Sequence, residues 1–142
     1  MAQQQQGFRS AGGDPSRQET DRHPVWLSGG RDAACGARAA IDLVTAEEFD
    51  ELEREDIRLM VSELVANSVL HGGATGADDL IHLVVRLSPT LLRVDCSDPA
   101  GGFDPPGDPA GWGLKMVDGL SSRWGVRSGI AGSTWFECDR LL

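Results

Sequence analysis

The spacing of hydrophobic residues changes from helical to alternating about halfway along this chain. Residues 31–44 carry apolar side chains every three or four positions, which predicts a helix. Thr45 and Glu48 match the pattern of a capping box, so we expect a second helix to begin there and to continue to His71. We expect an irregularity within residues 51–56 of that helix.

The second half of the chain predicts two hairpins and one short helix. Residues 80–87 and 91–96 are rich in Val, Leu and Ile, and the Ser-Pro-Thr sequence between them predicts a turn. A short helix is expected directly after Gly113. The chain then closes with a hairpin formed by residues 123–127 and 134–138.

This order of elements predicts an α+β fold, because helices precede an antiparallel sheet with one inserted helix. We expect a two-layer α/β sandwich, in which helices cover one face of a mostly antiparallel sheet. Residues 23–28 are expected to add an edge strand. The polar residues 1–22 include four consecutive glutamines and are predicted to be a disordered tail, which leaves residues 23–142 as one domain.

The composition is that of a globular protein with a strong acidic excess. Hydrophobic residues make up 40% of the 142 residues, and the formal net charge is -9. This charge argues against a nucleic acid or an anionic membrane as the main partner, because both require a positive surface. No apolar run approaches the roughly 18 residues of a membrane span. We therefore expect a cytoplasmic protein whose three cysteines are reduced core residues.

The most informative segment is the end of the second predicted helix, residues 62–72. At about 100° per residue, Glu63, Asn67 and His71 fall on one stripe of that helix. Apolar residues surround this stripe, so the helix is expected to be buried on nearly every side. A carboxylate and an amide are costly to bury unless they bind something. The segment therefore predicts a ligand site, although a core helix with polar positions near its end fits the same pattern.

Three later segments carry further candidate chemistry. Asp98 follows a predicted strand, where an aspartate is also an ordinary turn residue. Gly111 and Gly113 open a predicted helix whose first N–H groups favour a phosphate, and Lys115 adds positive charge nearby. Thr134 begins the last strand, a position that a β-branched residue occupies without any function. The sequence contains no P-loop, zinc-ligand cluster or serine-hydrolase motif.

Taken in this order, the segments resemble the ATP-binding domain shared by gyrase, the heat-shock ATPases and the histidine kinases, known as the Bergerat or GHKL fold. The resemblance covers roughly residues 33–142. More narrowly, the chain is similar to the stand-alone anti-sigma factors that are also protein serine kinases. Two positions depart from the family pattern, because Ala100 replaces a glycine and Trp112 stands where a smaller or basic residue is usual.

The resemblance implies a role for each candidate residue. Asn67 would bind Mg²⁺, and Glu63 would be the catalytic base for an attacking hydroxyl. Asp98 would accept the adenine amino group, and Thr134 would hold the adenine edge through water. The other nucleotide-binding positions would be Gly102, Gly111, Gly113, Leu114 and Lys115, with residues 103–110 as a lid over ATP.

The same resemblance implies ATP and Mg²⁺ as cofactors and a serine/threonine kinase activity. The substrate would be an anti-sigma factor antagonist, and the protein would also bind a sigma factor. Relatives of this kind often form homodimers. Two alternatives stay open: a non-catalytic ATP-binding module that regulates by partner binding alone, and a scaffold with a degenerate pocket.

Overall fold

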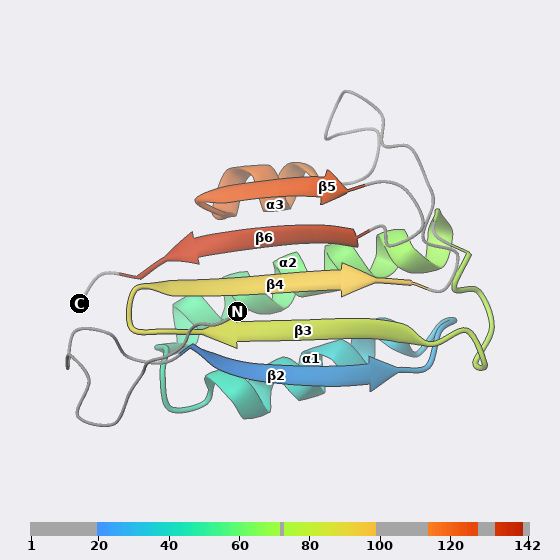
Figure 1. Ribbon diagram of the computed structural model, residues 1–142, viewed down its shortest axis with the longest axis horizontal. Coiled ribbons are helices and arrows are strands. Elements are labelled where there is room, and N and C mark those ends of the chain that lie inside the picture. The colour runs from blue at the N-terminus through green and yellow to red at the C-terminus, as the bar shows by residue number, and fades with distance from the viewer. Residues whose placement is uncertain (1–19, 72, 99–113, 128–132, 141–142) are drawn as a thin grey trace, which may run out of the picture.

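The computed structural model describes residues 20–71, 73–98, 114–127 and 133–140, which form three helices and one five-stranded sheet (Figure 1). The strands are β2 (Asp21–Leu27), β3 (Ile81–Leu87), β4 (Leu91–Ser97), β5 (Arg123–Arg127) and β6 (Ser133–Asp139). The helices are α1 (Ala33–Thr45), α2 (Glu51–Leu70) and α3 (Lys115–Leu120). The strand order is β2-β3-β4-β6-β5, and every neighbouring pair is antiparallel.

The helices α1 and α2 cover one face of the sheet and leave the other face open (Figure 1). Side chains of a strand point alternately to the two faces. In β4, for example, Val94 and Cys96 are buried under the helices, whereas Arg93 and Asp95 point to the open face. Phe136 on β6 is the largest fully buried side chain. The α+β two-layer sandwich expected from the sequence is therefore confirmed.

The helix α2 begins five residues later than the sequence pattern predicts, because its capping box lies at Asp50 and Glu53 and not at Thr45 and Glu48. The Asp50 carboxylate accepts a hydrogen bond from the Glu53 backbone N–H at 2.9 Å, and the Glu53 carboxylate accepts one from the Asp50 N–H at 3.1 Å. Thr45 cannot cap this helix, since it is the last residue of α1 and its hydroxyl donates to the Ile41 carbonyl at 2.7 Å. The expected irregularity within residues 51–56 is absent from α2, which is a continuous helix.

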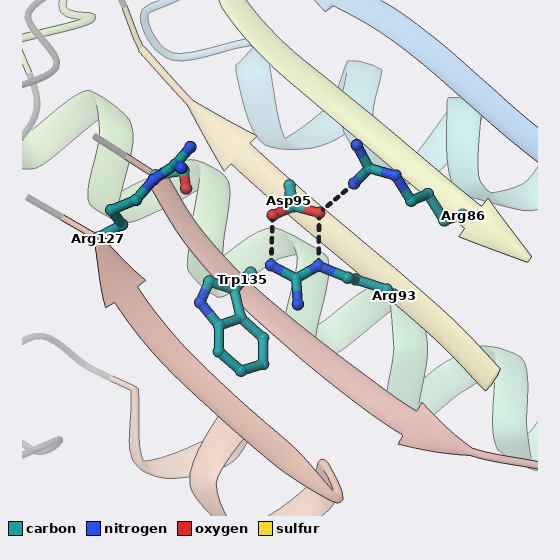
Figure 2. A pocket seen from close by; sticks show the side chains of 6 residues that line it. Arg86, Arg93, Asp95, Arg127 and Trp135 are labelled. Atoms are coloured by element: carbon teal, nitrogen blue, oxygen red, sulfur yellow. Dashed lines mark hydrogen bonds and ion pairs between the residues drawn. The ribbon is translucent and has the colours of Figure 1, made fainter. Parts of the chain in front are cut away.

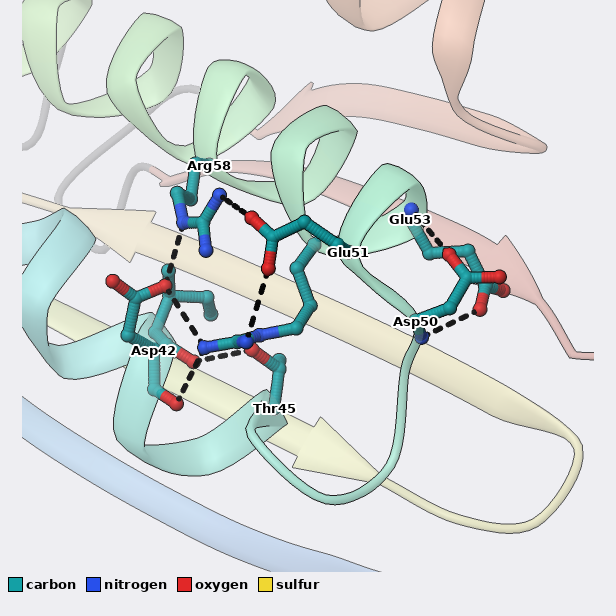
Figure 3. Close-up of polar contacts among 8 residues, drawn as sticks. Asp42, Thr45, Asp50, Glu51, Glu53 and Arg58 are labelled. Carbon is teal, nitrogen blue, oxygen red and sulfur yellow. Dashed lines mark hydrogen bonds and ion pairs between the residues drawn. The ribbon is translucent and has the colours of Figure 1, made fainter.

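A network of ion pairs joins the end of α1 to the first turns of α2 (Figure 3). Asp42 accepts from Arg58 Nε at 2.6 Å, and Glu51 accepts from Arg58 Nη1 at 2.9 Å. Arg54 lies between the same two carboxylates, 3.5 Å from Asp42 and 3.3 Å from Glu51. Because water screens exposed ion pairs, the network contributes mainly to the way the two helices lie against each other.

The surroundings of α2 differ from the expectation that nearly every side is buried. One face packs against the sheet, with Met60 and Leu64 fully buried. The opposite side faces solvent, and there Leu70 is 73% exposed and Leu59 is 41% exposed. The buried face is therefore an ordinary amphipathic stripe, and only polar residues on that stripe need a special explanation.

The first strand begins at Asp21, so the last two residues of the predicted tail belong to the sheet. Pairing of β2 with β3 along its whole length, from Asp21 opposite Leu87 to Leu27 opposite Ile81, accounts for this boundary. Residues 1–19 of the predicted tail lie outside the described residues, as do residues 103–110, the predicted lid.

The three cysteines are free, as expected, but only one of them is a core residue. Cys96 is buried, Cys138 is partly buried and Cys35 is exposed on α1. The expectation that all three are core residues is therefore wrong for Cys35, because its position in α1 points away from the sheet.

Candidate functional site

Asn67, the only asparagine of the chain, is the best-marked polar residue of the helix-covered side. It lies on the buried face of α2 and is only 2% exposed. Its side-chain nitrogen Nδ2 is buried and has no hydrogen-bond partner among the residues that the structure describes. A buried amide atom without a partner loses its hydration and gains nothing in return. The protein thus holds an amide in the position and state that the sequence predicts for a ligand-binding residue.

Glu63 lies one helical turn before Asn67, on the same side of α2. Its side chain is partly buried, and this burial raises the pKa of the carboxyl group above its ordinary value of 4.5. Burial is the cause of the shift, and no cation from the described part of the chain offsets it. A carboxylate in this state holds its proton more tightly than an exposed one, which makes it a stronger base.

A buried contact fixes this part of α2 against the sheet. The Ser68 hydroxyl and the Cys96 thiol lie 3.3 Å apart, and the same thiol is 3.8 Å from the Leu64 carbonyl oxygen. Burial raises the pKa of the Cys96 thiol to about 12, so this cysteine stays protonated and unreactive. Ser68 is the residue next to Asn67, and the contact therefore places Asn67 directly beside β4.

Two further candidate residues lie around the same cysteine. Thr134 on β6 is opposite Cys96 in the sheet register and is 3% exposed. Asp98 follows the end of β4 and is near enough for its charge to add to the raised pKa of the Cys96 thiol. The fold thus brings Asn67, Asp98 and Thr134, which are far apart in the sequence, to one end of the buried layer.

The helix α3 carries the remaining described candidates. Leu114 precedes α3 and is 1% exposed, so its side chain belongs to the core and only its backbone can face a ligand. Lys115, the first residue of α3, is exposed. A hydrogen bond of 2.8 Å from the Trp124 indole to Asp118 joins α3 to β5. The predicted nucleotide-binding residues Gly102, Gly111 and Gly113 lie outside the described residues.

His71 ends α2 and is exposed. Its backbone N–H donates to the Asn67 carbonyl at 2.8 Å, which closes the last turn of the helix. This hydrogen bond fixes the main chain at Asn67.

The side chains near Asn67 suit a Mg²⁺ ion that is held mainly by water and phosphate oxygens, and they do not suit a metal ion that is coordinated by protein side chains alone. Among the described residues, no group of three or more His, Cys, Asp or Glu side chains could hold a metal ion. Mg²⁺ usually takes only one or two protein oxygens and completes its shell with water and phosphate oxygens. The Asn67 amide can supply such an oxygen, because a half-turn of the amide exchanges Nδ2 for Oδ1 at its unpartnered position.

Two features of the molecule were missed at the sequence level. The Ser68–Cys96 contact joins two elements, and nothing in either local sequence predicts it. A hollow of about 350 Å³ lies on the open face of the sheet, lined by charged side chains and Trp135 (Figure 2). Its only sequence signal is the presence of Arg86, Arg93 and Asp95 at the polar positions of two alternating strands.

A family model described as a histidine kinase-like ATPase domain matches residues 32–134 of the chain. The matched region covers most of the chain, including α1, α2 and the sheet from β3 to the start of β6. The chain therefore belongs to the histidine kinase-like ATPase domain family, whose members bind ATP, usually with Mg²⁺. No curated protein matches the chain. Of the helices in the described part of the chain, none has the length and hydropathy needed to cross a membrane.

Proposed function

We propose that this protein is an ATP- and Mg²⁺-dependent serine/threonine kinase of the anti-sigma type. The observation that carries the proposal is the pair of uncompensated polar groups on α2, the buried Asn67 amide and the partly buried Glu63 carboxyl. Family membership supports a nucleotide as the ligand of this site. A nucleotide alone would require the amide, whereas only a phosphotransfer reaction also requires a base beside it.

Each residue has one task in this proposal. Asn67 presents its amide oxygen to Mg²⁺, which when bound neutralises phosphate charge and favours transfer of the terminal phosphoryl group. Glu63 accepts the proton of the serine or threonine hydroxyl as that oxygen attacks phosphorus. Asp98 and Thr134 hold the adenine. In this proposal the backbone at Gly102 approaches the adenine base. The phosphate contacts are made by Gly111, Gly113 and Lys115, and Leu114 lies between them as a further nucleotide-binding position.

The raised pKa of Glu63 suits the role of a general base. A carboxylate with an ordinary pKa is a weak base at neutral pH, and burial strengthens it by destabilising its charged form. Glu63 must be ionised to accept a proton, so the proposed transfer rate falls as the pH drops through its raised pKa.

The proposed protein partners are an anti-sigma factor antagonist, which accepts the phosphate, and a sigma factor, which the protein sequesters. These partners rest on the resemblance to stand-alone anti-sigma kinases, as does the proposed homodimer. The acidic net charge of -9 is compatible with protein partners and disfavours direct binding to nucleic acid.

Transfer of labelled phosphate from ATP to an antagonist encoded near this protein tests the kinase proposal. We expect transfer by the wild type and its loss in Glu63→Gln, at least about a hundredfold for removal of a general base. Glu55→Gln is the matched control, because Glu55 is an exposed glutamate of the same helix. Transfer that persists in Glu63→Gln would remove Glu63 from the catalytic role.

The competing function is a non-catalytic ATP-binding module that regulates by partner binding. Both proposals require ATP and Mg²⁺ to bind, which thermal stabilisation measures, and the transfer assay then separates them because only the kinase proposal requires transfer. We expect the wild type to be stabilised and Asn67→Ala and Asp98→Asn to lose this effect, with Asp56→Asn as an exposed control. Nucleotide binding without transfer to any antagonist would favour the module. Absence of stabilisation in the wild type would contradict both.

A further inference from the structure

The hollow on the open face of the sheet lies on the side away from α1 and α2 (Figure 2). Its volume of about 350 Å³ is in the range of binding pockets. The neighbouring inward residues Val94 and Cys96 are buried under the helices, so the residues of the hollow point in the opposite direction. The lining consists of Arg86, Arg93, Asp95, Arg127, Ser133 and Trp135.

The lining has a positive excess on a protein that is strongly negative overall. Three guanidinium groups line the hollow together with a single carboxylate, that of Asp95. The chain as a whole carries a formal charge of -9. A local field opposite in sign to the net charge favours an anionic ligand at this one place.

The centre of the hollow is held in place by Asp95 and Trp135. The two oxygens of Asp95 accept from Arg93 Nε and Nη2 at 2.9 and 3.0 Å, and Asp95 Oδ2 also accepts from Arg86 Nη1 at 2.7 Å. The Arg93 guanidinium lies 4.2 Å from the centre of the Trp135 ring. Arg93 is therefore a fixed part of the wall, and its charge is compensated.

Arg86 and Arg127 keep hydrogen-bond donors for a ligand. Arg86 engages only Nη1 in the contacts of the described residues. Arg127 is exposed and makes no ion pair or hydrogen bond within the described part of the chain. Figure 2 shows the two arginines on opposite sides of Asp95. A single small anion placed between them would lie against the Asp95 carboxylate, which repels it.

The sheet register sets the spacing of these two arginines. Arg86 is opposite Arg93, and Arg127 is opposite Ser133, which is opposite Ser97. Three strand spacings across the sheet and four residues along it separate their Cα atoms by about 20 Å. An extended peptide with two carboxylates can reach both arginines and pass over Asp95.

The Trp135 ring does not make this a nucleotide site. An aromatic base that stacked on the ring would have to displace Arg93, which is held by Asp95 and by Glu137 at 2.9 Å. A long polyanion such as nucleic acid would in addition meet the net negative charge of the chain. The carboxylates of a short peptide segment need not displace Arg93, and they carry too few charges to be repelled strongly by the chain as a whole. They also match the planar, bidentate geometry of the guanidinium group.

We propose that the open face binds an acidic segment of a protein partner, with two carboxylates contacting Arg86 and Arg127 separately. This surface lies on the opposite side of the sheet from Asn67, so a peptide and a nucleotide can be bound at the same time. The proposal does not depend on kinase activity. It adds a second binding function to the chain.

Fluorescence anisotropy with labelled peptides that consist of serine apart from two glutamates tests the proposal. Each peptide carries two glutamates separated by about three to six residues, the span that an extended chain at about 3.4 Å per residue requires. We expect the glutamate peptide of at least one spacing to bind about tenfold more tightly than the same peptide with glutamines in place of the glutamates. Added salt should weaken binding of the glutamate peptide. Equal binding of the glutamine peptide would overturn the proposal.

Charge-matched variants identify the arginines. Arg86→Gln and Arg127→Gln should each weaken peptide binding about fivefold or more, since each loses a charge-assisted contact. Arg31→Gln removes the same charge from an exposed position just before α1, outside the hollow, and should leave binding unchanged. Arg127 has no partner to lose in the described residues, so its variant should fold normally. Undiminished binding by the Arg86→Gln/Arg127→Gln double variant would contradict the proposal, as would displacement of the peptide by equimolar inorganic phosphate or a single-stranded oligonucleotide.

Discussion

The two sides of the sheet each involve a glutamate whose pKa departs from its ordinary value, and the two shifts have opposite signs. Glu63, on the helix-covered side, has a raised pKa because burial removes water and no cation replaces it. Glu137, on the open side, has a lowered pKa because Arg123 and Arg93 donate hydrogen bonds to it, each at 2.9 Å. A glutamate on the covered side thus has no cationic partner among the described residues, whereas a glutamate on the open face is paired with two arginines.

This contrast separates polar groups that pair with one another from polar groups that have no compensating partner among the described residues. On the open face, Arg93, Asp95 and Glu137 satisfy one another and hold the wall of the hollow. On the covered side, Asn67 and Glu63 carry an unmet cost in the free protein. Proteins commonly accept such a cost where binding or catalysis later offsets it.

The largest difference in stability is expected between substitutions of two adjacent β6 residues that point to opposite faces of the sheet. Phe136 is fully buried, so Phe136→Ala should lower the free energy of unfolding by about 3–5 kcal/mol through loss of apolar contacts and a cavity. Trp135 is only partly buried on the open face, so Trp135→Ala should lower it by roughly half as much or less. Denaturant unfolding of both variants measures the difference. Equal losses would mean that the open face also contains a true core.

A smaller loss of stability is expected when a methyl group is added at Gly125, next to the Trp135 ring. A methyl group at Gly125 would lie 2.8 Å from the Trp135 ring, so Gly125→Ala must displace the ring and disturb its stacking with Arg93. We expect a loss of about 1–3 kcal/mol, as is usual for overpacking. In the double variant Gly125→Ala/Trp135→Ala the ring is absent, and the loss due to Gly125→Ala should largely disappear. A double-mutant cycle by thermal unfolding tests this, and additive losses would contradict it.

Removal of Arg93 should have a still smaller effect on stability. In Arg93→Met, Asp95 keeps its contact with Arg86 and Glu137 keeps its contact with Arg123. We expect the free energy of unfolding to fall by less than about 1 kcal/mol, and the loss to shrink further in high salt. Val94→Ala, at the neighbouring inward position of β4, is the control and should cost more at every salt concentration. A large, salt-independent loss for Arg93→Met would show that the open-face network carries the fold.

The smallest effect, and the only stabilising one, should come from Glu63→Gln. Burial raises the pKa of Glu63, so the folded protein binds this proton more tightly than the unfolded chain, and the wild type loses stability as the pH rises through the raised pKa. The neutral variant avoids this loss. It should therefore be more stable than the wild type above that pKa, and the gain should vanish below the ordinary value of 4.5.

Calorimetry at about pH 4 and about pH 8 measures the stability difference for Glu63→Gln. Glu55→Gln, which changes an exposed glutamate of the same helix, should show no comparable pH-dependent gain. A Glu63→Gln variant that is less stable than the wild type at the higher pH would indicate that Glu63 has a compensating partner.

The periodicity of the sequence predicts the elements of this fold well, because side-chain alternation and helical spacing are local properties. It does not predict the start of α2. Both Thr45 with Glu48 and Asp50 with Glu53 match a capping box, and the choice depends on the Thr45 hydroxyl, which bonds to Ile41 within the preceding helix. The exposed side of α2 was also missed, since apolar residues such as Leu70 lie outside the buried stripe.

The sequence could predict the candidate site only where a residue's position depends on a single helix or strand. The burial of Asn67 and the intermediate position of Glu63 follow from one helix and were expected. The contact of Ser68 with Cys96 depends on how α2 lies over β4, and the hollow on the open face depends on β6 pairing with β4. Neither arrangement is visible in local sequence, because both join segments far apart in the chain.

The direct pairing of β4 with β6 has a consequence for how this protein can change over generations. These strands are hydrogen-bonded neighbours from Leu91–Asp139 to Ser97–Ser133, so the chain between them makes an excursion through α3 and the edge strand β5 before it returns beside β4. The entropy of closing such an excursion grows slowly, by only about 0.6 kcal/mol for each doubling of its length. Insertions or deletions within residues 99–113 should therefore be tolerated by the sheet while they alter whatever that segment contacts. The sheet register therefore lets the chain between β4 and α3 diverge in length and composition without loss of the scaffold.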